Sequence, residues 1–306
     1  MQYKFISENC DEFSVSEMCV CFGVSRSGYY SWPERVNSQR KMEDLLYKNR
    51  IQELHKQAKG RYGHRPIYHH LRQEEIRCGR DRTLRLMKEL GIGGIQKKGF
   101  KPQGTNSRHE FGYAPNLLKE LGSPSRCDQV WVADTTYLRT EGSWCYLATI
   151  MDLFSRRIIG WSVSLRNDTE QVSQALRGAV MNRGKKSLTG LIHHSDRGST
   201  YAAEKYEVLL KRLGIKASMS AKGNCYDNAS MELFYGRYKC SSVRGRVFSS
   251  EMEARANAFE YIEMFYNRFR KHASLGYKSP IEYEEKNFPP MGGRSRASLT
   301  TCSKNN

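Results

Sequence analysis

The sequence lacks the cysteine patterns and the long apolar runs that mark several classes of protein. Its nine cysteines are scattered from Cys10 to Cys302, their number is odd, and no two form a Cys-x-x-Cys pair. This argues against a zinc site and a disulfide framework, and it is typical of reduced thiols in the cytosol. The longest apolar run, Trp144–Met151, is far too short to span a bilayer. We find no signal peptide and expect a cytoplasmic protein without a membrane partner.

The sequence also lacks internal repeats and heptad runs, and it has few acidic residues relative to basic ones. Its 306 residues contain 50 lysines and arginines against 32 acidic residues, which gives a net charge of +18. Both halves of the chain contribute to this excess. Such a charge favours a polyanionic partner, most often nucleic acid, although ribosome-associated and membrane-surface proteins have a similar balance. The length predicts two or three domains.

A helix-turn-helix pattern opens the first expected domain, residues 1–58. Apolar residues recur at helical spacing over Val15–Phe22, and Gly23 breaks the pattern. Ser25 is placed to cap a second short helix that carries Arg26 near its start. Two helices joined by a glycine turn form the outline of many DNA-binding units, which makes Arg26 a candidate DNA contact. Any helical hairpin has this outline, so plain helix packing is the alternative.

A second helix-turn-helix-like module is expected at residues 59–92, after a polar helix at residues 36–59. Gly60–Ile92 contains two short apolar helical faces. Four arginines cluster around the start of its second helix: Arg77, Arg80, Arg82 and Arg85. Because a helix N-terminus already favours anions, we expect these arginines to contact DNA phosphates. An ordinary charged, solvent-facing helix is the alternative.

Residues 93–124 show no periodicity and are expected to form a basic linker. The segment is rich in glycine and lysine and includes Lys97 and Lys98. A long basic loop is a candidate for tracking along DNA, and a disordered hinge is equally compatible with this composition. We therefore include Lys97 and Lys98 among the candidate DNA contacts.

From residue 125 the pattern changes to that of an α/β domain, which is expected at residues 125–240. Three strands come first, and helix, strand, helix and strand follow, which is the order of an α/β sandwich. The five strands are expected at residues 129–138, 143–154, 156–164, 191–196 and 216–220. A helical extension is expected at residues 241–288, and a disordered tail at residues 289–306.

Two aspartates stand at the ends of two candidate neighbouring strands. Asp134 follows the apolar run Val130–Ala133, and Asp196 comes directly after the short strand Leu191–His194. Folds of the α/β class place their ligands at the carboxyl ends of strands. Two carboxylates held close together repel each other unless a cation lies between them. Oxygen ligands without histidine or cysteine suit Mg²⁺ or Mn²⁺, so this pair predicts such a site.

A third acid lies in the segment SAKGNCYDNASMELFYGRYK, residues 220–239. Asp227 precedes the helical part and is interpreted as its cap, with a ligand role as the alternative. Glu232 lies inside the helix, and helical spacing puts it on one face with Lys239. A metal-binding carboxylate and a lysine that contacts DNA phosphate suit a metal-dependent phosphodiester reaction.

These segments closely resemble the second-frame (OrfB-type) transposases of the bacterial insertion-sequence family three. The resemblance covers roughly residues 5–285 and rests on motifs that occur in order: FGVSRSGYYSW, RYGHRPIYHHLRQEEIRCGRDRTLRLMKELGI, QVWVADTTYL, HHSDRGSTY, SMSAKGNCYDNASMELFYGRYK and YNRFRKHASLGYKSPIEY. Asp134, Asp196 and Glu232, with 35 residues between the last two, resemble the DDE triad of retroviral-type integrases and transposases.

The resemblance implies an RNase H-like catalytic core, with a mixed five-stranded sheet and flanking helices, preceded by all-α helix-turn-helix-like DNA-binding modules. Asp134, Asp196 and Glu232 would bind two Mg²⁺ ions, with Mn²⁺ as a substitute. The implied reaction is hydrolysis that frees a 3′-OH at an element end, followed by transfer of that hydroxyl onto another phosphodiester. The implied partners are double-stranded DNA, at terminal inverted repeats and target sites, and further copies of the chain. We also expect His194 and Asn224 to line the site behind the acids.

One departure from the family pattern leaves an alternative open. The family's full enzyme usually fuses a first-frame product ahead of this region, and this sequence starts without it. The alternative function is therefore a second-frame product without its fused partner, acting as a DNA-binding regulator or as a nuclease that only hydrolyses. A fused or separate first-frame partner stays open in this interpretation. The role of Tyr266, Asn267 and His272 in the C-terminal motif stays open, and packing of their helix on the core is the simplest interpretation.

Overall fold

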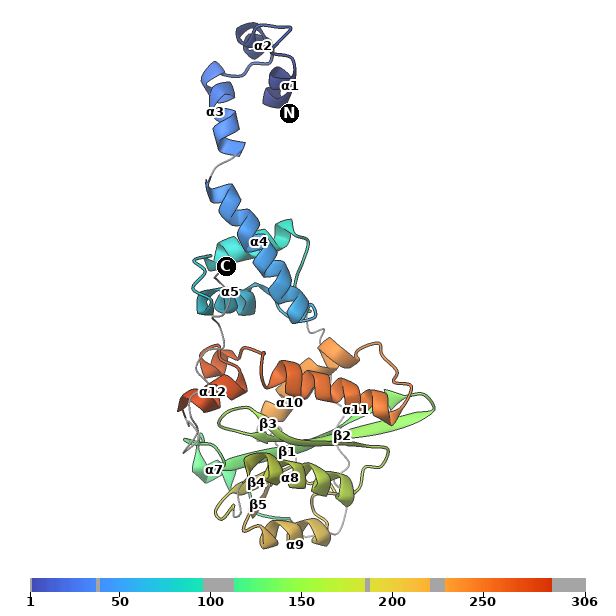
Figure 1. Ribbon diagram of the computed structural model, residues 1–306. Helices are drawn as coiled ribbons and strands as arrows, with labels where there is room; N and C mark the ends of the chain where they lie inside the picture. The colour runs from blue at the N-terminus through green and yellow to red at the C-terminus, as the bar shows by residue number, and fades with distance from the viewer. Residues whose placement is uncertain (1, 37–38, 96–112, 185–187, 221–228, 288–306) are drawn as a thin grey trace, which may run out of the picture. The chain divides into compact units, whose positions relative to one another are not determined.

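The computed structural model describes residues 2–36, 39–95, 113–184, 188–220 and 229–287 (Figure 1). The chain divides into two units, residues 1–94 and 95–306. Several residues of the sequence-based predictions lie outside the described ranges: Lys97, Lys98, Asn224, Asp227 and the tail 289–306. Among the described helices, none has the length and apolar character needed to cross a membrane.

The first three helices are α1 (Gln2–Glu8), α2 (Val15–Cys21) and α3 (Arg26–Val36). Ile6, Met18 and Cys19 form their buried core. The turn after α2 contains Gly23 with φ of 64°, a conformation that glycine adopts without strain. Ser25 Oγ accepts the main-chain N–H of Gly28 at 3.0 Å and so caps α3, as predicted. The helix-turn-helix outline is present, and α1 is an addition that the apolar spacing did not indicate.

The next three helices are α4 (Gln39–Gln57), α5 (His64–Gln73) and α6 (Arg80–Glu89), and they pack on one another. Their largest buried apolar side chains are Ile51, Leu54, Ile67, Leu71, Leu86 and Met87. α5 and α6 form the second helix-turn-helix-like pair that the sequence predicts. Leu45 and Leu46 of α4 are exposed, although both are apolar.

The second unit is built on a mixed five-stranded sheet in the order β3-β2-β1-β4-β5. The strands are β1 (Val130–Thr140), β2 (Ser143–Asp152), β3 (Ile158–Ser164), β4 (Ile192–Ser195) and β5 (Lys216–Met219). The first three strands pair antiparallel, whereas β4 runs parallel to both β1 and β5. The strands follow one another along the chain as predicted, and β1 lies in the middle of the sheet.

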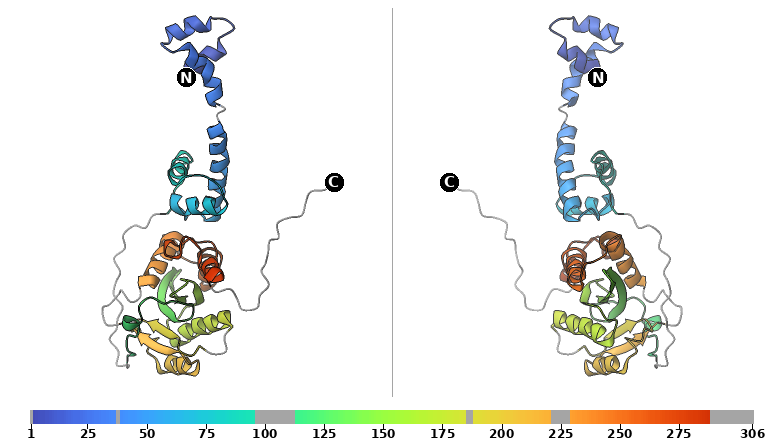
Figure 2. Two further views of the ribbon diagram at one scale, coloured as in Figure 1. Left: turned by 90° about the vertical axis from the view of Figure 1, so that its left-hand side faces the viewer. Right: turned by 90° about the vertical axis from the view of Figure 1, so that its right-hand side faces the viewer.

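Helices cover both faces of the sheet (Figures 1 and 2). On one face lie α8 (Thr169–Arg183) and α9 (Glu204–Arg212), which pack on Trp131, Ala133 and Ile150. Asp168 caps α8 by accepting the main-chain N–H of Gln171 at 3.0 Å. The opposite face carries α10 (Ala229–Tyr238), the π-helical turn η2 (Lys239–Val243), α11 (Glu251–Phe259) and its π-helical continuation η3 (Glu260–Tyr266). Short helices complete the unit: α7 (Leu118–Leu121), η4 (Ala273–Leu275) and α12 (Pro280–Asn287).

The C-terminal motif packs against the core, as expected. The buried side chain of Asn267 accepts the main-chain N–H of Ile158 at 2.9 Å and donates to its carbonyl at 2.8 Å, so it replaces a strand partner at the edge of β3. The Tyr266 ring lies edge-on to Phe234 of α10 at 4.8 Å between centroids, and edge-on to His272 at 5.0 Å. The motif therefore packs on both α10 and the edge of the sheet.

A buried arginine joins α8 to the start of β1, the end of β2 and α12. Arg183 forms ion pairs with Asp128 at 2.8 Å, Asp152 at 3.0 Å and Glu284 at 2.8 Å. Asp152 also accepts the main-chain N–H groups of Asp128, Phe154 and Ser155, and so holds the turn that follows β2. Burial alone would raise the pKa of Glu284, but hydrogen bonds and charge from Arg183 outweigh it and lower that pKa to about 2.

We predict that Glu284→Gln lowers the free energy of unfolding by about 2 kcal/mol at neutral pH, because it weakens a charged hydrogen-bond network around Arg183. Since folding lowers the pKa of Glu284 from 4.5 to about 2, its stabilisation is fully present above pH 4.5 and is lost as pH falls towards 2. Urea unfolding of both proteins between neutral and acid pH measures the difference. A gap that stays constant across this range would contradict the prediction.

Candidate active site

The strand register brings the two predicted aspartates together. β1 and β4 pair in parallel at Val130 with Ile192 and at Val132 with His194. Continuing this register by two residues aligns Asp134 with Asp196, at the point where β4 ends. β1 continues for six residues beyond Asp134, whereas β4 ends at Ser195. The two aspartates therefore lie on the central strands of the sheet, at the point where β1 loses β4 as its neighbour.

Electrostatic effects on Asp134 show which charged side chains lie around it. Burial raises the pKa of Asp134 to about 8, and the charges of Asp196 and Glu232 raise it as well. The main-chain N–H of Thr135, which donates to Asp134 Oδ1 at 2.7 Å, and the charge of Lys239 act in the opposite direction. The structure thus brings the three predicted acids and Lys239 to one place, although they come from β1, the end of β4, α10 and η2.

The carboxylate of Asp196 is held by the turn that follows β4. Its Oδ1 accepts the main-chain N–H of Gly198 at 3.0 Å. A Cβ atom at position 198 would lie only 2.9 Å from the same oxygen, closer than side chains normally approach. Glycine at this position therefore lets the turn close around the carboxylate.

The helix that carries Glu232 is fastened to the main chain of β1 and β2. The hydroxyl of Tyr235 lies 2.6 Å from the carbonyl oxygen of Asp134, 3.1 Å from that of Leu147 and 2.8 Å from Thr149 Oγ1. Tyr235 is 6% exposed, and burial raises its pKa well above the ordinary value, so the phenol stays neutral. Glu232 is exposed and lies one helical turn before Tyr235, on the same side of α10.

Lys239 approaches the acids along a gap in the edge of β1. β4 pairs with β1 only up to Val132, and the segment at Phe248 pairs with Thr140 further along the same edge. The ammonium group of Lys239 lies 4.2 Å from the ring centroid of Tyr137, within this gap. Burial lowers the pKa of Lys239, and the charge of Asp134 partly opposes that effect.

His194 shares a face of β4 with Asp196 and is buried. Its Nδ1 lies 2.9 Å from Ser218 Oγ and its Nε2 lies 3.0 Å from Ser220 Oγ, so the ring ties β4 to β5 and to the residue after it. The neighbouring His193 points to the opposite face, where Nε2 lies 3.0 Å from the hydroxyl of Tyr206. The two histidines therefore do not converge.

Sequence reasoning missed the roles of Tyr235, Gly198 and Thr149. Tyr235 lies on the helix face that Glu232 and Lys239 were predicted to share. This shared face could have indicated that Tyr235 belongs to the site. Thr149 is the one polar residue in the apolar run of β2, and a buried hydroxyl there needs a partner on the neighbouring helix. Gly198 offers no comparable signal, because a glycine after a strand is ordinary turn chemistry.

The predicted DNA contacts of the first unit divide into two groups. Arg82 binds Asp44 at 2.7 Å and Glu43 at 3.0 Å, and Arg85 binds Asp44 at 2.7 Å, so both arginines connect α6 to α4. Three others are exposed at or near the start of a helix: Arg26, Arg77 and Arg80. A role of all five in binding DNA stays a prediction.

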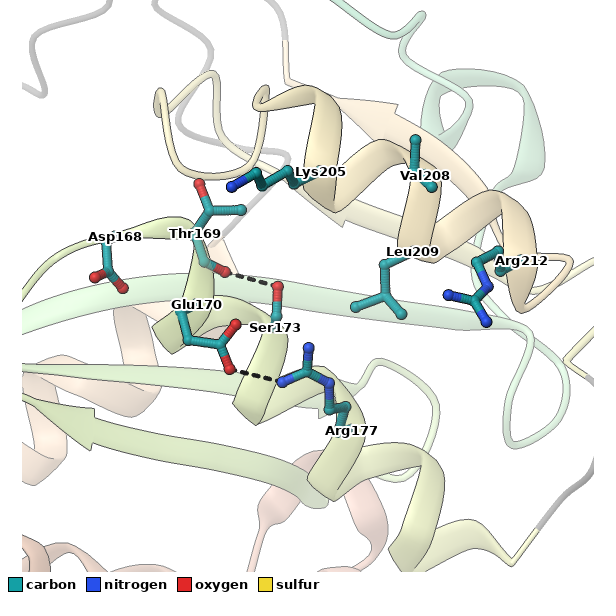
Figure 3. A pocket seen from close by; sticks show the side chains of 9 residues that line it. All are labelled: Asp168, Thr169, Glu170, Ser173, Arg177, Lys205, Val208, Leu209 and Arg212. Carbon is teal, nitrogen blue, oxygen red and sulfur yellow. Dashed lines mark hydrogen bonds and ion pairs between the residues drawn. The ribbon is translucent and has the colours of Figure 1, made fainter.

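Two further features of the described residues resemble a ligand pocket and a metal site, but in each of them acidic side chains are already paired with arginines. A hollow of about 450 Å³ lies between α8 and α9, on the face of the sheet away from α10 (Figure 3). It has charges of both signs, with Glu170 paired to Arg177 at 2.7 Å.

The ligand atoms of Cys127, Asp152 and Glu284 lie within 4.8 Å of one another, as they would around a metal ion. Arg183 already pairs with both carboxylates, and burial raises the pKa of the Cys127 thiol to about 12.

Comparison with known proteins identifies the class to which this fold and these acids belong. Residues 124–225 and 232–288 match descriptions of an integrase core domain, and residues 41–100 match that of a helix-turn-helix-like domain. The structure is similar to the catalytic core domain of BIV integrase, with a TM-score of 0.38 and 20% identity over 52% of this chain and 95% of that one. By its sequence matches the second unit is an integrase core domain, and such cores depend on a divalent metal ion.

Two curated relatives narrow the class to a family. The uncharacterized 31 kDa protein of insertion element IS600 from Shigella sonnei is 45% identical over 88% of this chain and 98% of its own length. Transposase InsF of insertion sequence IS3A from Escherichia coli is 36% identical over 94% of this chain and its own full length. The chain belongs to the transposases of insertion-sequence family three, which are DNA-binding polynucleotidyl transferases of the DDE type.

We predict that Tyr235→Phe reduces DNA cleavage at least tenfold, because α10 loses its bond to the main chain of Asp134 and Glu232 shifts relative to the aspartates. The free energy of unfolding should fall by about 1–3 kcal/mol, since buried carbonyl groups lose a donor. Tyr206→Phe is the matched control, as it removes one buried hydroxyl on the opposite face of the sheet. It should lose comparable stability and keep its cleavage rate. Equal cleavage by the two variants would refute the positioning role.

Proposed function

We propose that Asp134, Asp196 and Glu232 hold two Mg²⁺ ions and catalyse DNA cleavage and strand transfer at the ends of an insertion sequence. The observation that carries this proposal is the convergence of the three carboxylates where β4 ends, with Asp196 and Glu232 both raising the pKa of Asp134. Such an arrangement is unfavourable without a cation, because the charges repel one another in a half-buried site.

The donor set fits a hard divalent cation. All three side chains offer carboxylate oxygens, which Mg²⁺ and its substitute Mn²⁺ prefer. When bound, the ions would activate the attacking oxygen and stabilise the leaving one.

The chain's own residues would position the reacting phosphodiester. Lys239 is placed to bind a phosphate oxygen, because its half-buried ammonium group faces the same gap as Asp134. Tyr235 fixes Glu232 relative to Asp134, so little reorganisation is needed when charge develops on the phosphate. Water attack would free a 3′-OH at the element end, and attack by that hydroxyl on a second phosphodiester would join the strands.

DNA recognition would involve the helices of the first unit. Arg26, Arg77 and Arg80 are the best placed candidates, since their side chains are exposed near helix starts that favour phosphate. Lys97 and Lys98 would extend this contact along the linker. We expect several copies of the chain to act together on double-stranded DNA, with terminal inverted repeats and a target site as the two substrates, and a first-frame partner or fusion to add further contacts.

We predict that Asp134→Asn, Asp196→Asn and Glu232→Gln each reduce Mg²⁺-dependent cleavage of the element ends by about a thousandfold or more, since each removes a metal ligand worth several kcal/mol in the transition state. Glu170→Gln, which changes an exposed carboxylate in the hollow beside α9, should cut at the wild-type rate. The assay uses labelled duplexes of the element's own ends and resolves cut from joined products. Wild-type cleavage by any of the three variants would contradict the assignment, and cut products that are never joined would favour a nuclease.

We also predict that the two groups of arginines respond differently to substitution. Arg77→Ala with Arg80→Ala should weaken DNA binding and lower the dependence of log Kd on log salt by about 2, because two phosphate contacts are lost. Arg82→Ala should mainly lower the melting temperature, since Arg82 connects α6 to α4. Filter binding over a salt series and thermal unfolding separate these effects. The division fails if the Arg77/Arg80 variant keeps the wild-type salt dependence.

A further inference from the structure

Two aromatic side chains stand exposed on the hairpin that carries Asp134. Tyr137 of β1 is 47% exposed and Trp144 of β2 is 46% exposed, and their rings meet edge-to-face with centroids 5.2 Å apart. Both side chains lie on the sheet face that carries α8 and α9, because alternation along β1 puts Tyr137 on the same face as Trp131 and Ala133. These two helices cover the centre of that face. The described helices stop short of this end of the hairpin, so large apolar surface is left in solvent.

The pair is held rigidly and is not part of a mobile tip. β1 and β2 pair continuously from Trp131 with Asp152 to Thr140 with Ser143. The segment at Phe248 adds main-chain bonds on the other edge, where its N–H donates to Arg139 and its carbonyl accepts from Glu141. Aromatic side chains on a paired hairpin lose little conformational entropy when a planar partner binds to one of their rings.

Lys239 connects this surface to the acids. Its ammonium group lies 4.2 Å from the centroid of the Tyr137 ring, and its positive charge lowers the pKa of Asp134. Arg139, two residues further along β1, is exposed beside the pair. Tyr137 is three residues from Asp134, about 10 Å along the strand, and its side chain leaves the opposite face of β1, at the unpaired edge where Lys239 contacts it. Exposed aromatic rings with interleaved cations, next to a phosphodiester site, are the features with which proteins bind single-stranded nucleic acid.

We infer that Tyr137 and Trp144 form a stacking platform for an unpaired base of the DNA strand whose phosphate lies at the acids. A base inside a duplex is stacked on both sides and offers no free ring face, so the occupant must be unpaired. Because Tyr137 lies about 10 Å from Asp134 along the strand, the stacked base would lie within a few nucleotides of the reacting phosphate. The platform would hold the end of the element open. This inference rests on the proposed function, since it assigns the substrate strand to the same acids.

The test compares two duplexes of the element's own end, one fully paired and one with three terminal nucleotides left unpaired. Affinity is measured for the full chain in EDTA, so that no metal-dependent cleavage occurs. A 2-aminopurine base in the unpaired stretch reports stacking through loss of fluorescence. We expect the wild type to bind the frayed duplex about tenfold more tightly and to quench the probe, which is the size of one base–aromatic stacking contact.

Variants of the two aromatic residues test the platform directly. Tyr137→Ala and Trp144→Ala should each lose the preference for the frayed end and the quenching, while Tyr137→Phe and Trp144→Phe should keep both. The matched control is Phe259→Ala, which removes a 50% exposed aromatic side chain from α11. It should behave as the wild type. Because Tyr137 and Trp144 are exposed, thermal unfolding of the alanine variants should be nearly unchanged.

Three results would overturn the inference. The first is a wild type that binds paired and frayed ends equally. The second is a preference for frayed ends that survives in the Tyr137→Ala, Trp144→Ala double variant. The third is a change in oligomeric state of the alanine variants by sedimentation with no change in that preference, which would make this surface a contact between copies. Asp134→Asn separates this inference from the proposed function, because it should abolish cleavage and keep the preference for frayed ends.

Discussion

The hydroxyl of Tyr235 on the carbonyl oxygen of Asp134 is the contact on which the geometry of the site depends. Three acids of like charge do not assemble by their own attraction, and the pKa of Asp134 is raised first by burial and then by the charges of Asp196 and Glu232. The sheet register fixes Asp134 beside Asp196. Only α10 brings Glu232 to them, and Tyr235 binds that helix to the strand that carries Asp134. The phenol therefore joins the two halves of the site.

The rest of the second unit keeps α10 in this position from outside. Phe234 and Tyr238 of α10 pack on Tyr261 and Tyr266, and Asn267 holds that aromatic layer to the free edge of β3. On the far side, Arg183 fastens α12 and the strand ends through three carboxylates. Substitutions far from the acids can thus impair the reaction, because a small displacement of reacting groups has a large effect on rate.

Sequence patterns predicted the succession of strands along the chain, most of the helices, the three acids and Lys239, because alternation, helical spacing and the family motifs are local signals. They did not predict that Arg82 and Arg85 pair with Asp44, since ion pairs between α4 and α6 depend on how those helices pack. The exposure of Leu45 and Leu46 has the same origin. The bonds of Tyr235 join residues about a hundred positions apart, and no local pattern reports such a contact. The sequence alone also left the role of Asn267 undefined, because its partner is main chain.

The central claim is that the three carboxylates bind metal as one set. The most direct measurement is Mn²⁺ binding by calorimetry to the full chain and to Asp134→Asn, Asp196→Asn, Glu232→Gln and Glu170→Gln. The account predicts that each of the first three variants loses high-affinity Mn²⁺ binding and that Glu170→Gln retains it. Wild-type Mn²⁺ binding by any one of the first three would contradict the claim.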